Sequence, residues 1–106
     1  MDTRLLVAFS TFANAETARN VARTLVEERL AACANIVPQI ESIYHWQGKL
    51  ETSAEVFVIF KTTRDRYPAF EQRLRALHSY DVPEIVAIDI AAGLSAYLNW
   101  IVESVS

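Results

Sequence analysis

The chain has 106 residues, a net charge of -3 and a single cysteine, Cys33. A chain of this length can bury roughly two thirds of its unfolded surface in one domain. The negative charge and the scattered Lys and Arg residues exclude an electrostatic surface for nucleic acid or anionic membrane. No apolar run approaches the ~20 residues that span a bilayer, no secretion signal opens the sequence, and one cysteine cannot form an intrachain disulfide. We therefore expect one cytoplasmic domain over residues 1–106.

The first half of the chain predicts a strand, a helix and a second strand. Residues 5–9 are all apolar, which is typical of a central strand buried on both faces. Asn14 can cap a helix with one apolar stripe, and with no Gly or Pro to end it we expect this helix to reach Ala32. Residues 33–46 then form an unusually long strand. Because Pro38 has no amide hydrogen to give to a ladder, it predicts a bulge in an edge strand.

The second half predicts a hairpin, a helix, a strand and a final helix. A turn at residues 47–49 leads into a return strand at residues 54–61, which completes a long hairpin. Pro68 fits the first turn of the next helix, where its missing amide hydrogen costs nothing. The apolar run 85–90 predicts a fourth strand, and Ser95 can cap a short terminal helix.

This order of elements, βαββαβ plus a helix, favours an α+β fold of the ferredoxin-like sandwich type. We expect an antiparallel sheet in the order 4-1-3-2 with the two main helices on one face. Strands 1, 3 and 4 are apolar on both faces, and a monomer rarely exposes so large an apolar surface. We therefore expect other copies of the chain to cover the second face and to pair through the hairpin at residues 39–60.

Candidate site residues gather before the fourth strand and at the end of the hairpin. The topology places Thr11, Trp46, His78, Tyr80 and Glu84 at one pole of the sheet. His78 can be a metal ligand, but a histidine at a helix C-terminus is also stabilised by the helix dipole, and we favour that structural role. A carboxylate that enters an apolar strand needs a partner, which can be His78, Tyr80, a Lys or Arg of another subunit, or a metal. We expect Glu84 to be paired without any metal.

The remaining candidates have structural explanations too. Cys33 begins the second strand at the opposite pole, where a small buried apolar role is more typical than ligation. Only a neighbouring subunit could bring it to His78. The rings of Tyr44, Trp46 and Trp100 suit interface or core anchors better than a stacking platform.

Five segments, taken in order, resemble the CutA family, which is named for divalent-cation tolerance. They are residues 30–36 (LAACANI), 42–49 (SIYHWQGK), 61–63 (KTT), 78–84 (HSYDVPE) and 97–100 (YLNW). The chain departs from the family pattern at Ser79, where proline is usual. Ser10 and Leu77 also stand where members proposed to bind copper carry a cysteine and a second histidine.

The resemblance implies a tight homotrimer built through the long hairpins and a role in divalent metal tolerance. Copper or another divalent cation is then the expected cofactor, with His78, Glu84 and Cys33 as candidate ligands. The candidate ligand-binding or interface residues are Tyr44, Trp46, Lys61, Tyr80 and Trp100.

The residues also allow two other functions to be compared with this one. A trimeric signalling or scaffold module, similar to the PII proteins, would bind a small ligand or a partner protein in clefts between subunits. A hydrolase of the acylphosphatase kind would need a Gly-rich loop for its anion, whereas Gly48 and Gly93 are the only glycines. We therefore expect a protein that is not an enzyme.

Overall fold

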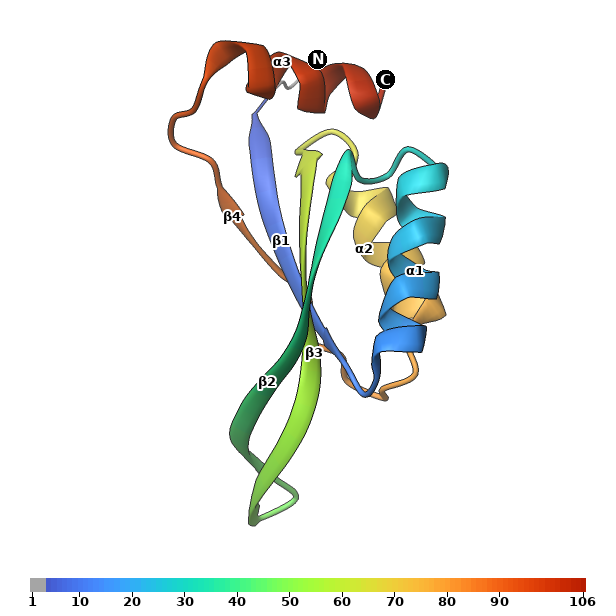
Figure 1. The fold of residues 1–106 in the computed structure, drawn as a ribbon, viewed down its shortest axis with the longest axis vertical. Coiled ribbons are helices and arrows are strands. Elements are labelled where there is room, and N and C mark those ends of the chain that lie inside the picture. Colours follow the sequence, from blue (N-terminus) through green and yellow to red (C-terminus); the bar gives the residue numbers. More distant parts are fainter. Residues whose placement is uncertain (1–3) are drawn as a thin grey trace.

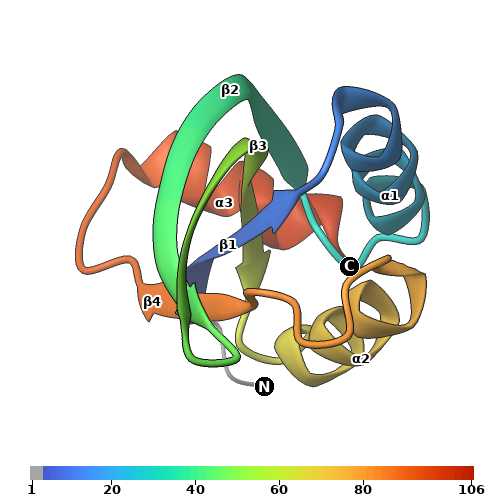
Figure 2. The same cartoon turned by 90° about the horizontal axis from the view of Figure 1, so that it is seen from below.

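The computed structural model describes residues 4–106, which form a four-stranded antiparallel sheet and three helices. The elements are β1 (Leu5–Phe12), α1 (Ala15–Glu27), β2 (Cys33–Trp46), β3 (Lys49–Thr63), α2 (Tyr67–Leu77), β4 (Val86–Asp89) and α3 (Ser95–Ser104). The sheet order is β2-β3-β1-β4, and α1 and α2 lie side by side on one face (Figure 1; Figure 2). The predicted α+β ferredoxin-like sandwich and its 4-1-3-2 order are confirmed.

The main core lies between the sheet and these two helices. Alternate residues of β1 and β3 point toward the helices, so Ala8, Val58 and Phe60 are fully buried. Phe60 meets Phe70 of α2 edge to face at 5.1 Å between ring centroids, and Leu25 of α1 is also fully buried. Packing of this kind orients β1 and α2, whose ends form part of the candidate site.

Helix α1 begins as predicted but ends earlier than predicted. The Asn14 side chain accepts a hydrogen bond of 2.8 Å from the Thr17 amide. The helix stops at Glu27, not at Ala32, because Arg29 adopts a left-handed backbone with φ of 61°. The amides of Arg29 and Leu30 then bond back to the carbonyls of Val26 and Leu25, which is the Schellman ending usually built around glycine.

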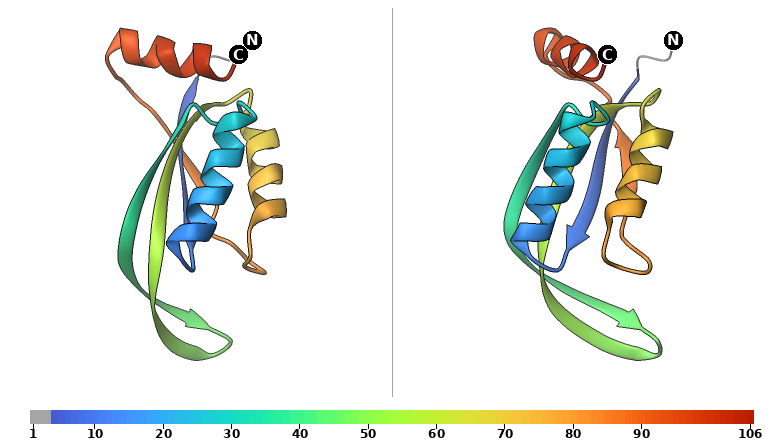
Figure 3. Two further views of the ribbon diagram at one scale, coloured as in Figure 1. Left: turned by 45° about the vertical axis from the view of Figure 1, so that its right-hand side comes forward. Right: turned by 90° about the vertical axis from the view of Figure 1, so that its right-hand side faces the viewer.

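The hairpin of β2 and β3 is the longest feature of the molecule. Its register shifts between Val37 and Ile40, so Pro38 lies at a bulge, as predicted. Gln47 and Gly48 both have positive φ, 51° and 80°, which suits a tight two-residue turn. Beyond the rest of the sheet the hairpin continues as a curved arm (Figure 3). β3 starts at Lys49, five residues before the predicted start, because this arm is paired but polar.

The far face of the sheet is only partly covered. Helix α3 crosses one end, where Ile101 and Val105 pack against Leu5. Ser95 is the first helical residue of α3, and Leu94 before it occupies the cap position. The predicted Ser95 cap is therefore wrong. Lower on this face Val86 and Ile88 of β4 are 49% and 57% exposed. Within residues 4–106, none of the helices is both long and apolar enough to cross a bilayer.

Candidate functional site

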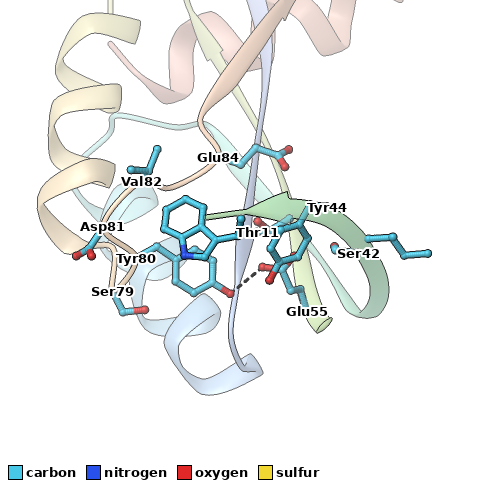
Figure 4. A pocket seen from close by; sticks show the side chains of 11 residues that line it. Thr11, Ser42, Tyr44, Glu55, Ser79, Tyr80, Asp81, Val82 and Glu84 are labelled. Atoms are coloured by element: carbon cyan, nitrogen blue, oxygen red, sulfur yellow. Dashed lines mark hydrogen bonds between the residues drawn. The ribbon is translucent and has the colours of Figure 1, made fainter. Parts of the chain in front are cut away.

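The loop between α2 and β4 faces the curved arm of the hairpin across a pocket of about 690 Å³ (Figure 4). The lining residues are Thr11 of β1, Ser42, Ile43, Tyr44, Trp46 and Glu55 of the hairpin, and Ser79, Tyr80, Asp81, Val82 and Glu84 of the loop. Of the pole predicted from the sequence, Thr11, Trp46, Tyr80 and Glu84 thus line one pocket. His78 lies behind them.

The strand register brings the hairpin residues to one face. Tyr44 pairs with Glu51 and Ser42 pairs with Ser53, so the alternate residues Ser42, Tyr44 and Trp46 share one face of this arm, and all three line the pocket. The Tyr44 hydroxyl and the Ser53 hydroxyl share a hydrogen bond of 2.6 Å. The Tyr44 ring is therefore tied to the neighbouring strand.

A tyrosine and a glutamate form the polar centre of the pocket. The Tyr80 hydroxyl donates a hydrogen bond of 2.7 Å to Oε2 of Glu55, which Figure 4 marks between loop and hairpin. Burial and then this bond to Glu55 raise the pKa of Tyr80, so the phenol stays protonated and stays a donor. Sequence reasoning missed Glu55, although it is the one charged residue within the apolar run 54–60 of the return strand.

His78 is held by hydrogen bonds at both ring nitrogens. Nε2 lies 2.8 Å from the carbonyl oxygen of Thr11, so it must carry a proton and donate it. Nδ1 accepts the amide hydrogen of Tyr80 at 3.1 Å, so it must be bare. The ring also stacks on Phe12 at 4.5 Å, and burial lowers the pKa of His78. This neutral histidine links β1 to the loop between α2 and β4. A metal ion at either ring nitrogen would have to replace one of these two hydrogen bonds.

Glu84 lies differently from the prediction. Its side chain is exposed at the pocket edge, and no side chain among residues 4–106 bonds to it. Neither His78 nor Tyr80 pairs with it, so the predicted partner would have to come from another subunit. Glu84 precedes β4 and its carboxylate is exposed, so water solvates it in the single chain.

Cys33, Lys61 and Trp100 lie at the opposite end of the sheet, next to α3. Lys61 Nζ donates to Oδ1 of Asn35 at 2.9 Å and lies 3.9 Å from the Cys33 sulfur. The Tyr97 hydroxyl is 3.8 Å from the same sulfur, and the Tyr97 ring stacks on Trp100 at 5.5 Å. The candidates therefore separate into two groups, and Cys33 does not meet His78 within one chain.

Within residues 4–106 of one chain, the candidate ligands do not fit a metal ion. Copper and other transition metals are held by several nitrogen, sulfur or oxygen ligands at once. Across residues 4–106, no three His, Cys, Asp or Glu side chains are grouped closely enough to do this. His78 is engaged, Glu84 stands alone, and Cys33 is at the other end of the sheet.

The fold and site define a ferredoxin-like protein with an extended hairpin and a pocket beneath it. A model of the family described as "CutA1 divalent ion tolerance protein" matches residues 6–104. The chain belongs to this family, which confirms the resemblance carried by the five segments. Solved structures agree: CutA1 of Thermus thermophilus superposes with a TM-score of 0.92 at 48% identity, covering 94% of this chain and 97% of that one. CutA1 of Oryza sativa has a TM-score of 0.92 at 42% identity, with 95% and 93% covered.

Curated relatives differ in how much of their length the chain spans. It is 49% identical to the divalent-cation tolerance protein CutA of Thermus thermophilus over 92% of this chain and 95% of the relative. It is 44% identical to Protein CutA of Mus musculus over 93% of this chain but only 58% of the relative. The family description concerns tolerance of divalent ions.

Proposed function

We propose that this chain acts in divalent-cation tolerance as a homotrimer. The observation that carries the proposal is the uncovered far face of the sheet. Phe9 and Phe57 stack there at 5.5 Å, next to the exposed side chains of Val86 and Ile88. A contiguous apolar surface of this kind is typical of an interface between subunits.

The hairpin supplies the second element of such an assembly. β2 is an edge strand of the sheet, and no strand of residues 4–106 pairs with its outer edge, so another chain can pair there. Ile43 and Leu50, near the hairpin tip, are 65% and 67% exposed. A hairpin that contacts a different surface of the next copy makes a head-to-tail contact, and three such contacts can close into a ring.

A divalent cation would then take its ligands from more than one subunit. Glu84 is the most available ligand, because it is exposed and unbonded within residues 4–106. Cys33 can contribute only across a subunit boundary. A cytoplasmic location is part of the proposal, since it would keep this thiol reduced. The proposed role is binding, without a chemical step.

Light scattering tests the assembly. We expect the mass of a trimer in dilute buffer, and Ile88→Lys should reduce it by placing a charge on the far face. Asn99→Lys is the matched control, because it adds the same charge to an exposed position of α3. A folded monomer for the parent chain would refute the trimer.

Calorimetric titration of the purified oligomer with copper and with zinc tests the cation. Glu84→Gln should weaken binding ~10-fold or more, as loss of a ligand or of its supporting contacts typically does. His78→Ala should leave the affinity unchanged while the oligomer stays intact. If His78→Ala lowers the affinity ~10-fold and Glu84→Gln does not, the ligand assignment is wrong.

A further inference from the structure

The pocket between the hairpin and the loop has no assigned ligand, and its chemistry is that of a site for a positive charge. We propose that it binds a small organic cation, an alkylammonium ion. This goes beyond a role in divalent-cation tolerance, and it depends on the shape and charge of the pocket alone.

The charged side chains of the lining are carboxylates. They belong to Glu55, Asp81 and Glu84, and no Lys, Arg or His from residues 4–106 lines the pocket. Figure 4 shows the Glu55 carboxylate beside Tyr80 and Tyr44, with Asp81 and Glu84 further out on different sides of Tyr80. A pocket of this kind attracts cations and repels phosphates and carboxylates, so a nucleotide of the kind expected for a PII-like module is disfavoured here.

Aromatic side chains make up the apolar part of the same lining. Tyr44 and Trp46 come from the hairpin and Tyr80 comes from the loop. The face of an aromatic ring attracts a cation, and Trp and Tyr are the strongest such partners in sites for quaternary ammonium groups. Ile43 and Val82 add surface for alkyl groups.

The pocket is held in shape before any ligand arrives. Tyr80 is fixed at its hydroxyl by Glu55 and at its amide by His78. Tyr44 is fixed at its hydroxyl by Ser53. Rings that are already oriented lose little conformational freedom on binding, which favours affinity for a small ligand.

The same geometry distinguishes an organic cation from a metal ion. Metal ions need oxygen, nitrogen or sulfur ligands at about 2.0 to 2.6 Å, and no suitable group of three exists among residues 4–106. A quaternary alkylammonium ion, such as choline, spreads its charge over the methyl and methylene groups on its nitrogen. It needs only ring faces and carboxylates nearby, and the volume of about 690 Å³ is ample for it.

Tryptophan fluorescence can test the proposal, because the two tryptophans lie in different places. Trp46 lines the pocket, whereas Trp100 stacks on Tyr97 next to α3. Trp100→Phe therefore makes Trp46 the only tryptophan, and Trp46→Phe is its matched control. The purified oligomer is titrated with choline and, in parallel, with 3,3-dimethyl-1-butanol, which has the same shape without the charge.

We expect choline to change the Trp46 emission saturably in the Trp100→Phe protein, and the neutral alcohol to bind about tenfold more weakly or not at all. The Trp46→Phe protein should show no saturable change. Glu55→Gln keeps an acceptor for Tyr80 but removes the charge, so it should weaken choline binding several-fold, while Glu103→Gln on α3 should not. Equal responses to choline and the alcohol would overturn the proposal. So would the absence of any saturable response, as expected if a neighbouring copy fills the pocket.

Discussion

Replacing His78 by alanine should destabilise the protein by about 3 kcal/mol near neutral pH. The structure gives the terms of this sum. The substitution removes the bond to the Thr11 carbonyl, the bond from the Tyr80 amide and the ring stacked on Phe12. Each of the two hydrogen bonds contributes roughly 1 kcal/mol, and the stacked ring pair contributes about 1 kcal/mol more.

The loss should depend on pH in a definite direction. Burial lowers the pKa of His78 from its ordinary value of 6.5, so the unfolded chain binds this proton more tightly than the folded one. The neutral ring thus contributes fully above that value, and the parent chain loses stability as the pH falls below it. The alanine variant has no such group, so the difference between the two proteins should shrink on acidification.

Denaturant titrations at about pH 8 and about pH 5, in chelator and at one protein concentration, measure both effects. His45→Ala is the matched control, because His45 is the only other histidine and is exposed on the hairpin. It should change stability by less than ~0.5 kcal/mol at either pH. A His78→Ala protein as stable as the parent at about pH 8, or one whose deficit grows in acid, would refute the reasoning.

Three further changes test other features. Glu84→Gln should alter the free energy of unfolding by less than ~0.5 kcal/mol in chelator, and a larger loss would mean that another subunit supplies a partner. Ser10 is fully buried and its hydroxyl has no hydrogen-bond partner among residues 4–106. Ser10→Ala should therefore raise the free energy of unfolding by about 1 kcal/mol, seen as a higher denaturant midpoint, and a lower midpoint would contradict this. Gln47→Asn should raise the melting temperature slightly, because asparagine adopts positive φ beside Gly48 more easily than glutamine does, and a lower one would argue against this turn geometry.

Much of the fold could be predicted because hydrophobic pattern and topology agree. Continuous apolar runs marked β1 and the inner part of β3, and Pro38 marked the bulge. The end of α1 could not be predicted, because Arg29 occupies a left-handed position that glycine usually fills. The outer part of β3 was missed because its side chains are polar and its order comes from pairing with β2.

The site was predictable in position but not in its contacts. The topology indicated correctly that Trp46, Tyr80 and Glu84 would lie at one pole. It could not reveal that Tyr80 bonds Glu55, because that contact depends on how far the hairpin curves back. Glu84 was expected to be paired because the strand behind it is apolar on both faces. In the structure the carboxylate is exposed ahead of β4, so in the single chain water can take the place of a partner.

The curved arm of the hairpin also has a consequence for how amide hydrogens exchange with solvent. Its amides between Glu41 and Thr52 bond across the two strands, but both strands there are almost entirely exposed. A two-stranded ribbon without a core opens easily, so these amides should exchange orders of magnitude faster than those of β1 in an isolated subunit. If neighbouring copies of the chain contact the arm, exchange of its amide hydrogens should slow as the protein concentration rises through the range where subunits associate. Exchange at the hairpin therefore provides a residue-by-residue record of association, while the amides of β1 report global unfolding.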